Sequence, residues 1–112
     1  MGKEHGDLIT EIIENVNRSG GAWVWRNQCG LFKSPDGKRW ISVGLKGSAD
    51  ITGLNKNGVR IEIEVKVGRD KQQLEQQQFE CAVVAMGGKY CLVKSVEEAL
   101  DFVKFSLRSP GC

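Results

Sequence analysis

No stretch of the 112-residue sequence approaches the ~20 consecutive apolar residues that a membrane-spanning helix requires. The sequence also lacks internal repeats and low-complexity segments. The net charge is only +2 at pH 7, so any nucleic-acid binding must depend on a local patch of cations. The length and the ordinary apolar fraction of 40% favour one small globular domain over residues 1–112, with no membrane partner.

Cysteine pairs are missing as well. The four cysteines, Cys29, Cys81, Cys91 and Cys112, form no CxxC pair, and no signal-peptide pattern is present. A disulfide framework or a zinc knuckle is therefore not expected. We therefore expect scattered, buried thiols in a reducing compartment, that is, a cytoplasmic protein.

The first half of the sequence predicts one helix followed by three or four strands. Apolar residues at helical spacing between Leu8 and Val16 predict a first helix that stops at residues 19–21. Strands are expected at 22–32, 38–45, 49–54 and 59–66. The turn signal SPDG predicts that the first two of these strands form a hairpin.

The second half predicts helix, strand, helix. Asp70 and Gln73 have the spacing of a capping box at the start of a helix. That helix is expected to close at the glycine pair 87–88, a strand follows, and Ser95 caps a last helix. The apolar stripes predicted to face inward are Phe79, Ala82, Val83 and Met86 on the second helix, and Val96, Ala99, Leu100 and Val103 on the third.

The expected fold class is thus α/β, a mixed sheet flanked by helices. The strands at 59–66 and 90–94 are separated by a helix, which predicts that they lie parallel. The earlier strands are joined by tight turns and should be antiparallel. The core is expected over about residues 8–103, with a frayed tail at 106–112.

The stretch IEIEVKVG alternates apolar and charged residues, and its charged face is unusual. If residues 56–58 form a three-residue hairpin loop, Asp50 lies opposite Glu64, and Lys66 is one step along the same face. Two carboxylates this close repel one another, and a divalent cation relieves the repulsion. This arrangement predicts a catalytic metal site in which the lysine helps to activate water.

The alternative is that the charged face is simply solvated, as in many antiparallel sheets. On that interpretation Glu64 and Lys66 form a surface ion pair of little energetic consequence. Arg60 and Glu62 are assigned no chemistry. Gln76 shares a helical face with the apolar stripe, which favours a side chain that points inward to the charged strand. The alternative is that Gln76 is solvent-exposed at the first turn of its helix.

The segments GSADITG, EVK and QQQFECAVVAMGGKYCLVKSVEEAL together resemble the VRR-NUC domain, a virus-type replication-repair nuclease of the PD-(D/E)xK superfamily. The resemblance covers roughly residues 8–103. It implies a restriction-endonuclease-like core of helix, three-stranded meander, helix, strand and helix. It also implies a metal-dependent DNA endonuclease that uses Mg2+ or Mn2+.

The resemblance also implies roles for individual residues. Asp50 and Glu64 match the metal ligands, Lys66 the catalytic lysine, and Gln76 the glutamine of the following helix. By analogy, the backbone carbonyl of Val65 is a further ligand.

The sequence departs from the family in two places. The residue before the aspartate is Ala49 rather than proline. In the first helix Glu4 is the nearest candidate for the family's acid, and His5, the only histidine, is interpreted as a core or capping residue.

Cations near these residues are candidates for DNA binding. Arg26 and Asn27 match an Arg-Asn segment of the family and are predicted phosphate contacts. The other predicted DNA-binding residues are Lys33, Lys46, Arg69 and Lys71, the last two at the start of the second helix, where backbone N–H groups favour phosphate. No base-reading motif is found, so recognition of DNA shape is expected.

Stand-alone members of this family resemble phage or bacterial Holliday-junction resolvases, which act as two-fold dimers. The resemblance therefore implies a homodimer that cleaves branched DNA in DNA repair. Trp23, Trp25 and Trp40 are candidates for the dimer interface, although at least one of them is expected in the core. Two alternatives stay open: a non-catalytic nucleic-acid-binding or assembly module, and a subunit of a larger repair or restriction complex.

Overall fold

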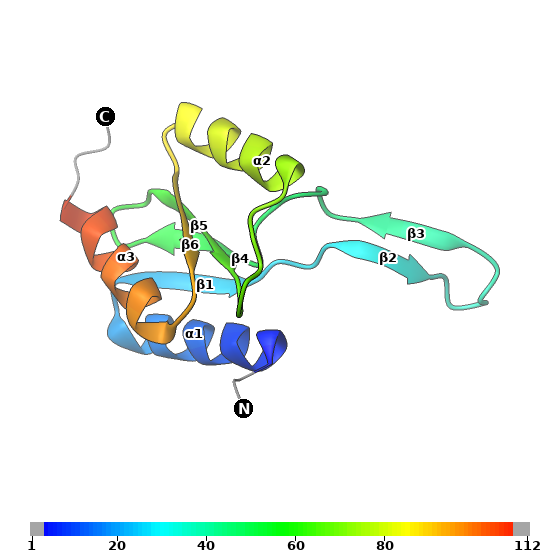
Figure 1. The fold of residues 1–112 in the computed structure, drawn as a ribbon, viewed down its shortest axis with the longest axis horizontal. Coiled ribbons are helices and arrows are strands. Elements are labelled where there is room, and N and C mark those ends of the chain that lie inside the picture. Colours follow the sequence, from blue (N-terminus) through cyan, green and yellow to red (C-terminus); the bar gives the residue numbers. More distant parts are fainter. Residues whose placement is uncertain (1–3, 109–112) are drawn as a thin grey trace.

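The computed structural model describes residues 4–108, which form a mixed α/β structure (Figure 1). Among these residues no helix has the length and apolarity needed to span a bilayer. The elements in chain order are α1 (His5–Ser19), β1 (Ala22–Arg26), β2 (Gly30–Lys33), β3 (Trp40–Val43), β4 (Ile51–Asn55), β5 (Arg60–Val65), α2 (Leu74–Ala85), β6 (Lys89–Val93) and α3 (Val96–Arg108).

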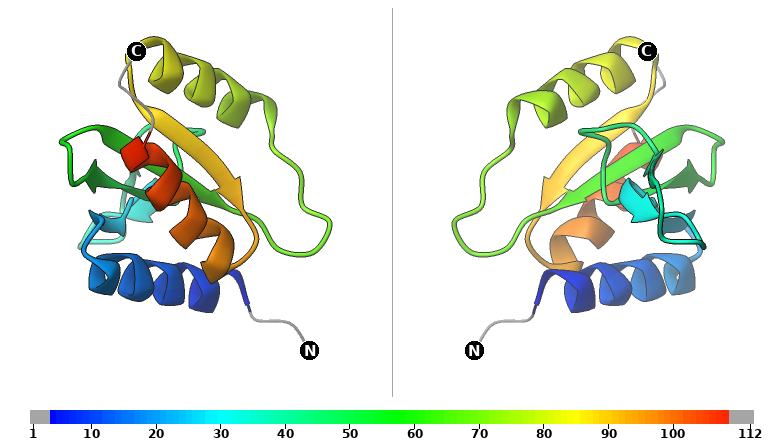
Figure 2. Two further views of the ribbon diagram at one scale, coloured as in Figure 1. Left: turned by 90° about the vertical axis from the view of Figure 1, so that its left-hand side faces the viewer. Right: turned by 90° about the vertical axis from the view of Figure 1, so that its right-hand side faces the viewer.

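The main sheet has the strand order β1-β4-β5-β6. Strands β1, β4 and β5 are antiparallel neighbours, and β6 runs parallel to β5, as predicted from the helix between them. Helices α1 and α3 lie side by side on one face of the sheet, and α2 lies on the other (Figure 2). The fold is therefore a mixed sheet with helices on both faces.

The core lies between the sheet and the α1–α3 layer. Alternate residues of the strands point into it, since successive side chains of a strand face opposite sides. Apolar periodicity therefore predicted this layer correctly. The buried members are Leu8, Ile9, Ile12, Val16, Val24, Ile51, Ile61, Ile63, Val65, Val93, Ala99, Phe102 and Val103.

The predicted hairpin across the SPDG turn is present but shorter than expected, because only residues 30–33 pair with the next strand. Strand β3 pairs with β2, and together they form a separate two-stranded sheet inserted between β1 and β4. Figure 1 shows this ribbon, called here the arm, extending away from the main sheet. The segment 22–32 is two strands, and the break at Asn27–Cys29 lets the chain leave the sheet.

The start of α2 also differs from the prediction. The N-cap is Gln73, not Asp70, and the capping box joins Gln73 to Gln76. Arg69 and Lys71 therefore lie in the loop before the helix. The apolar stripe of α2 is not core either, because α2 has no buried residue and Met86 is 89% exposed. Cys81 on α2 and Cys29 are exposed as well, so the expected burial of the thiols is wrong for these two.

The last helix begins as predicted and ends later. The Ser95 hydroxyl accepts a hydrogen bond from the Glu98 backbone N–H (3.1 Å). Helix α3 continues to Arg108, and Ser106 is buried, donating to the Val103 carbonyl (2.7 Å). A frayed tail from residue 106 is therefore wrong for 106–108, and residues 109–112 lie outside the described residues.

Candidate active site

The hairpin between β4 and β5 has the predicted three-residue loop. The Asn55 N–H donates to the Val59 carbonyl (2.9 Å), and Gly58 has φ +81°, a backbone conformation that favours glycine. The register pairs Ile51 with Ile63. Continued by one residue, this register sets Asp50 opposite Glu64, as predicted.

Asp50 is fixed by the segment in front of it. The Asn27 N–H donates to the Asp50 carbonyl (2.8 Å). The Asn27 side chain donates to the Ala49 carbonyl (2.9 Å) and the Ser48 hydroxyl (2.8 Å). The Asp50 carboxylate in turn accepts from the Val65 N–H (2.9 Å). Asn27, predicted as a phosphate contact, thus uses its amide to hold the chain at Asp50.

Glu64 is buried, with 3% of its surface exposed. Its Oε2 atom accepts a hydrogen bond from the Gln76 amide (2.8 Å) and lies 3.4 Å from the Lys66 ammonium. Its Oε1 atom is buried and has no hydrogen-bond partner among the described residues. A buried carboxylate oxygen without a partner is costly, and a cation would stabilise it.

The electrostatics of the site agree with this geometry. Burial and, to a smaller extent, the nearby Asp50 carboxylate together raise the pKa of Glu64 to about 7, although Lys66 opposes both effects. Lys66 is itself buried. The interpretation of this strand face as a solvated surface is therefore wrong.

Gln76 reaches the site because of how α2 begins. Its Oε1 atom accepts from the Gln73 N–H (2.8 Å), which closes the capping box. Its Nε2 atom then donates to Glu64. One amide side chain thus both stabilises the start of α2 and orients the carboxylate, in agreement with the inward orientation of Gln76.

His5 is a site residue that sequence reasoning missed. Its Nε2 lies 2.7 Å from the Val65 carbonyl oxygen and 3.3 Å from Asp50 Oδ2. Glu4, the predicted helix-one acid, is exposed and is the N-cap of α1, without a side-chain cap bond. The sequence signal for His5 is its place on the apolar stripe of α1, one turn before Leu8. From the sequence alone, that position of His5 is interpreted as core or capping.

The predicted DNA-binding cations lie at several places around the site. The Arg26 guanidinium donates to the Gly6 carbonyl and the Thr10 hydroxyl, both at 3.2 Å, near the start of α1. Lys33 lies on the arm, over the ring of Trp40. Lys46 pairs with Glu75 (3.6 Å), and Arg69 and Lys71 are exposed in the 66–73 loop.

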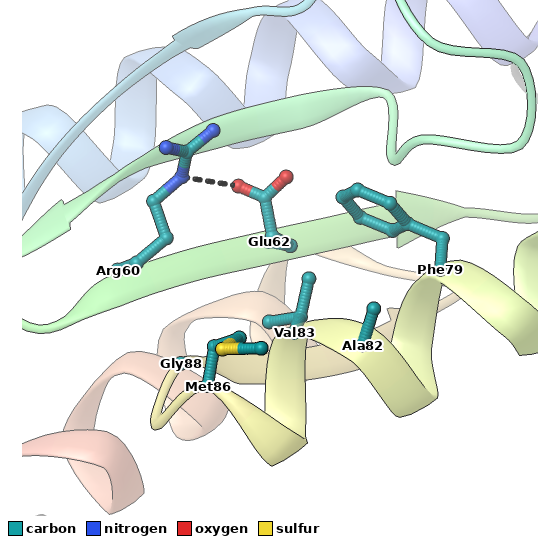
Figure 3. A pocket seen from close by; sticks show the side chains of 7 residues that line it. All are labelled: Arg60, Glu62, Phe79, Ala82, Val83, Met86 and Gly88. Atoms are coloured by element: carbon teal, nitrogen blue, oxygen red, sulfur yellow. Dashed lines mark hydrogen bonds and ion pairs between the residues drawn. The ribbon is translucent and has the colours of Figure 1, made fainter.

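Of the two polar residues that are assigned no chemistry, Arg60 is exposed and Glu62 is buried. Glu62 is 1% exposed, accepts a hydrogen bond from Thr52, and pairs with Arg60 (2.9 Å). Figure 3 shows this pair on the sheet side of a groove of about 290 Å³ under α2. Because the two charges of this pair neutralise each other, the pair supports the sheet and is not part of the candidate site formed by Asp50, Glu64 and Lys66.

Comparison with protein-family models and with curated proteins found no match for this chain. The donor set therefore has to be judged on its own chemistry. Within residues 4–108, no three His, Cys, Asp or Glu side chains are grouped to hold a metal ion. Two carboxylates, a backbone carbonyl and water suffice for Mg2+, which keeps several waters and takes one or two carboxylates.

Proposed function

We propose that this protein is a Mg2+- or Mn2+-dependent DNA endonuclease with a restriction-endonuclease-like core of the VRR-NUC type. The observation that carries the proposal is the partnerless, buried Glu64 Oε1 atom beside Asp50 and Lys66. Structural carboxylates normally have their hydrogen bonds satisfied. A buried carboxylate oxygen that lacks a hydrogen-bond partner and lies beside a second acid is better explained as a ligand of a metal ion.

Each residue of the site has a chemical task in this proposal. Asp50, Glu64 and the Val65 carbonyl would hold the ion, which when bound stabilises charge on the phosphate and lowers the pKa of water. Lys66 is placed to orient the attacking water or to stabilise the negative charge that develops on the phosphate. Gln76 keeps Glu64 in its orientation through the 2.8 Å bond.

The substrate proposed is branched DNA, such as a Holliday junction, cut by a homodimer. The support is chemical: exposed cations flank the site, and backbone contacts carry no base sequence information. Two symmetric cuts require two sites related by a two-fold axis, which a homodimer supplies.

The test is cleavage of four-way, flap, splayed and linear DNA, side by side, with Mg2+ or Mn2+ and with chelator. We expect metal-dependent cleavage that prefers a branched substrate. Asp50→Ala and Lys66→Ala should each lower the rate by at least about 100-fold, as loss of a charge-stabilising group does. Circular dichroism checks that the variants fold. Cleavage that persists in both variants would refute the assignment, and metal-independent DNA binding alone would favour the non-catalytic module.

A further inference from the structure

The arm formed by β2 and β3 exposes a set of large apolar side chains. All eight residues of the two strands are exposed. An isolated two-stranded hairpin is marginally stable in water, so such an arm needs a surface to pack on. Apolar residues gathered on an exposed element mark an interaction site. The exposed apolar residues of the arm and its base are Leu31, Phe32, Trp40, Ile41, Val43 and Leu45.

The base of the arm is held to the body by close contacts. A Cβ atom added at Gly47 would lie 2.6 Å from the Glu75 carbonyl oxygen of α2, so only glycine permits this approach. The Cys29 thiol donates to the Leu45 carbonyl (3.2 Å), which joins the two sides of the base. The arm is therefore oriented by the structure and is not a loose loop.

The two faces of the arm differ. The register pairs Phe32 with Ile41 and Gly30 with Val43, and paired residues share a face. That face is wholly apolar. The other face carries Lys33 over the Trp40 ring, 5.4 Å from its centroid. If the arm bound only DNA, the Phe32–Ile41–Val43 face would stay in water, so a protein surface is the better partner.

The same chain carries an open apolar surface, called here the open face. Val24 of β1 is buried in the core, so Trp23 and Trp25 point to the opposite side of the sheet, the side of α2. Trp23 is paired with Leu54 of β4, and Trp23, Trp25 and Leu54 are 75%, 49% and 46% exposed. Trp40 is exposed too, so the expectation that at least one of the tryptophans is in the core is wrong. Helix α2 contacts the β6 side and leaves this half of the sheet uncovered.

The open face continues into the groove under α2. Leu54 is paired with Arg60 of β5, which lies on the sheet side of the groove. Figure 3 shows the helix side of the groove, formed by Phe79, Ala82, Val83 and Met86. Apolar side chains thus line the open face and the helix side of the groove, with Arg60 between the two.

We propose that the arm of each protomer lies on the open face of a second copy, in a reciprocal two-fold exchange. Charge favours this partner: α2 carries Glu75 and Glu80 and no basic residue, whereas the arm carries three cations against one carboxylate. Lys46, at the base of the arm, already pairs with Glu75 of its own chain.

The available area is of the right order. A stable interface buries about 800 Å² on each partner. An aromatic side chain buries about 150–250 Å². Each protomer would contribute Trp23, Trp25, Phe32 and Trp40, all about half exposed or more, together with aliphatic residues of both surfaces. The inference rests on the dimer of the proposed function and names the surfaces that form it.

The experiment is sedimentation velocity of the full chain over a range of concentrations, without metal or DNA. Ile41→Glu alters the arm and Leu54→Glu alters the open face. Each variant should be monomeric, because neither homodimer has an intact arm–face contact. The equimolar mixture should form dimers again, since one intact contact remains, and this rescue also shows that both variants fold. Phe105→Glu, an exposed apolar site on α3, is the matched control and should stay dimeric.

A monomeric wild-type chain, or variants that remain dimeric, would overturn the proposal. Dimers of Ile41→Glu that have lost DNA affinity would overturn it too and assign the arm to DNA. The readout needs neither cleavage nor metal. A chain that associates as described and cuts no DNA would therefore refute only the proposed nuclease function.

Discussion

The imidazole Nε2 of His5 lies 2.7 Å from the carbonyl oxygen of Val65, across 60 residues of sequence. A carbonyl only accepts hydrogen bonds, so Nε2 carries the hydrogen. The same nitrogen is 3.3 Å from Asp50 Oδ2. One N–H group thus lies near both oxygens that are proposed as cation ligands, so the imidazole would compete with a bound ion for them.

His5→Ala should therefore strengthen Mn2+ binding by several-fold, because a hydrogen bond of about 1 kcal/mol no longer competes. The metal-free variant should lose about the same free energy of unfolding. Calorimetric titration with Mn2+ and urea denaturation measure the two effects, with Glu14→Ala on the exposed side of α1 as the control. Weaker Mn2+ binding in His5→Ala would show instead that the imidazole is a ligand.

Glu64 predicts a pH dependence of stability. Its folded-state pKa of about 7 lies above the ordinary value of 4.5, so this group favours folding below pH 4.5 and the advantage is lost as the pH rises through 7. When Glu64 is fully ionised in the folded state, the free energy of unfolding has fallen by about 3 kcal/mol. Metal-free Glu64→Gln should therefore gain stability over the wild type between about pH 5 and about pH 8, by urea denaturation.

Glu97→Gln, at an exposed position in the first turn of α3, is the control and should show no such gain. Added Mg2+ should stabilise the wild type by mass action and leave Glu64→Gln unchanged. Parallel pH profiles for Glu64→Gln and the wild type would show that Glu64 ionises as an ordinary surface acid.

Asn27→Ala should separate a structural role from DNA contact. The substitution removes two hydrogen bonds that hold residues 48–49, so we expect the free energy of unfolding to fall by about 1–3 kcal/mol. Because Asp50 would then shift, cleavage should also be slower. Binding of DNA without metal should keep its affinity in fluorescence anisotropy. Asn57→Ala, at an exposed turn, is the matched control. A variant of normal stability that binds DNA poorly would make Asn27 a phosphate contact.

Arg69 and Lys71 are exposed in the loop that precedes α2. We assume that each residue contacts one phosphate of duplex DNA. Replacing either by alanine should then reduce the magnitude of the slope of log K for DNA binding against log salt concentration by about 0.9. Anisotropy titrations at several salt concentrations measure the slope, and Lys104→Ala on the outer side of α3 serves as the control. Slopes equal to that of the wild type would place the DNA elsewhere.

The sequence by itself determined the α1–α3 core layer, the strand at 60–65, and the register that sets Asp50 opposite Glu64. These features depend on local physics: periodicity of 3.6 or 2, a glycine in a left-handed turn, and a cap at Ser95. The helical repeat placed Gln76 on the face of the apolar stripe but left open whether its amide reaches the charged strand, and the structure shows that it does.

Only the tertiary structure decided the rest. The break that divides the predicted strand 22–32 into β1, which pairs with β4, and β2, which pairs with β3, depends on where the chain leaves the sheet. The place of His5 depends on how the first turn of α1 packs against the end of β5, 60 residues away. Short-range patterns carry no information on such contacts, because they arise only when distant segments share one core.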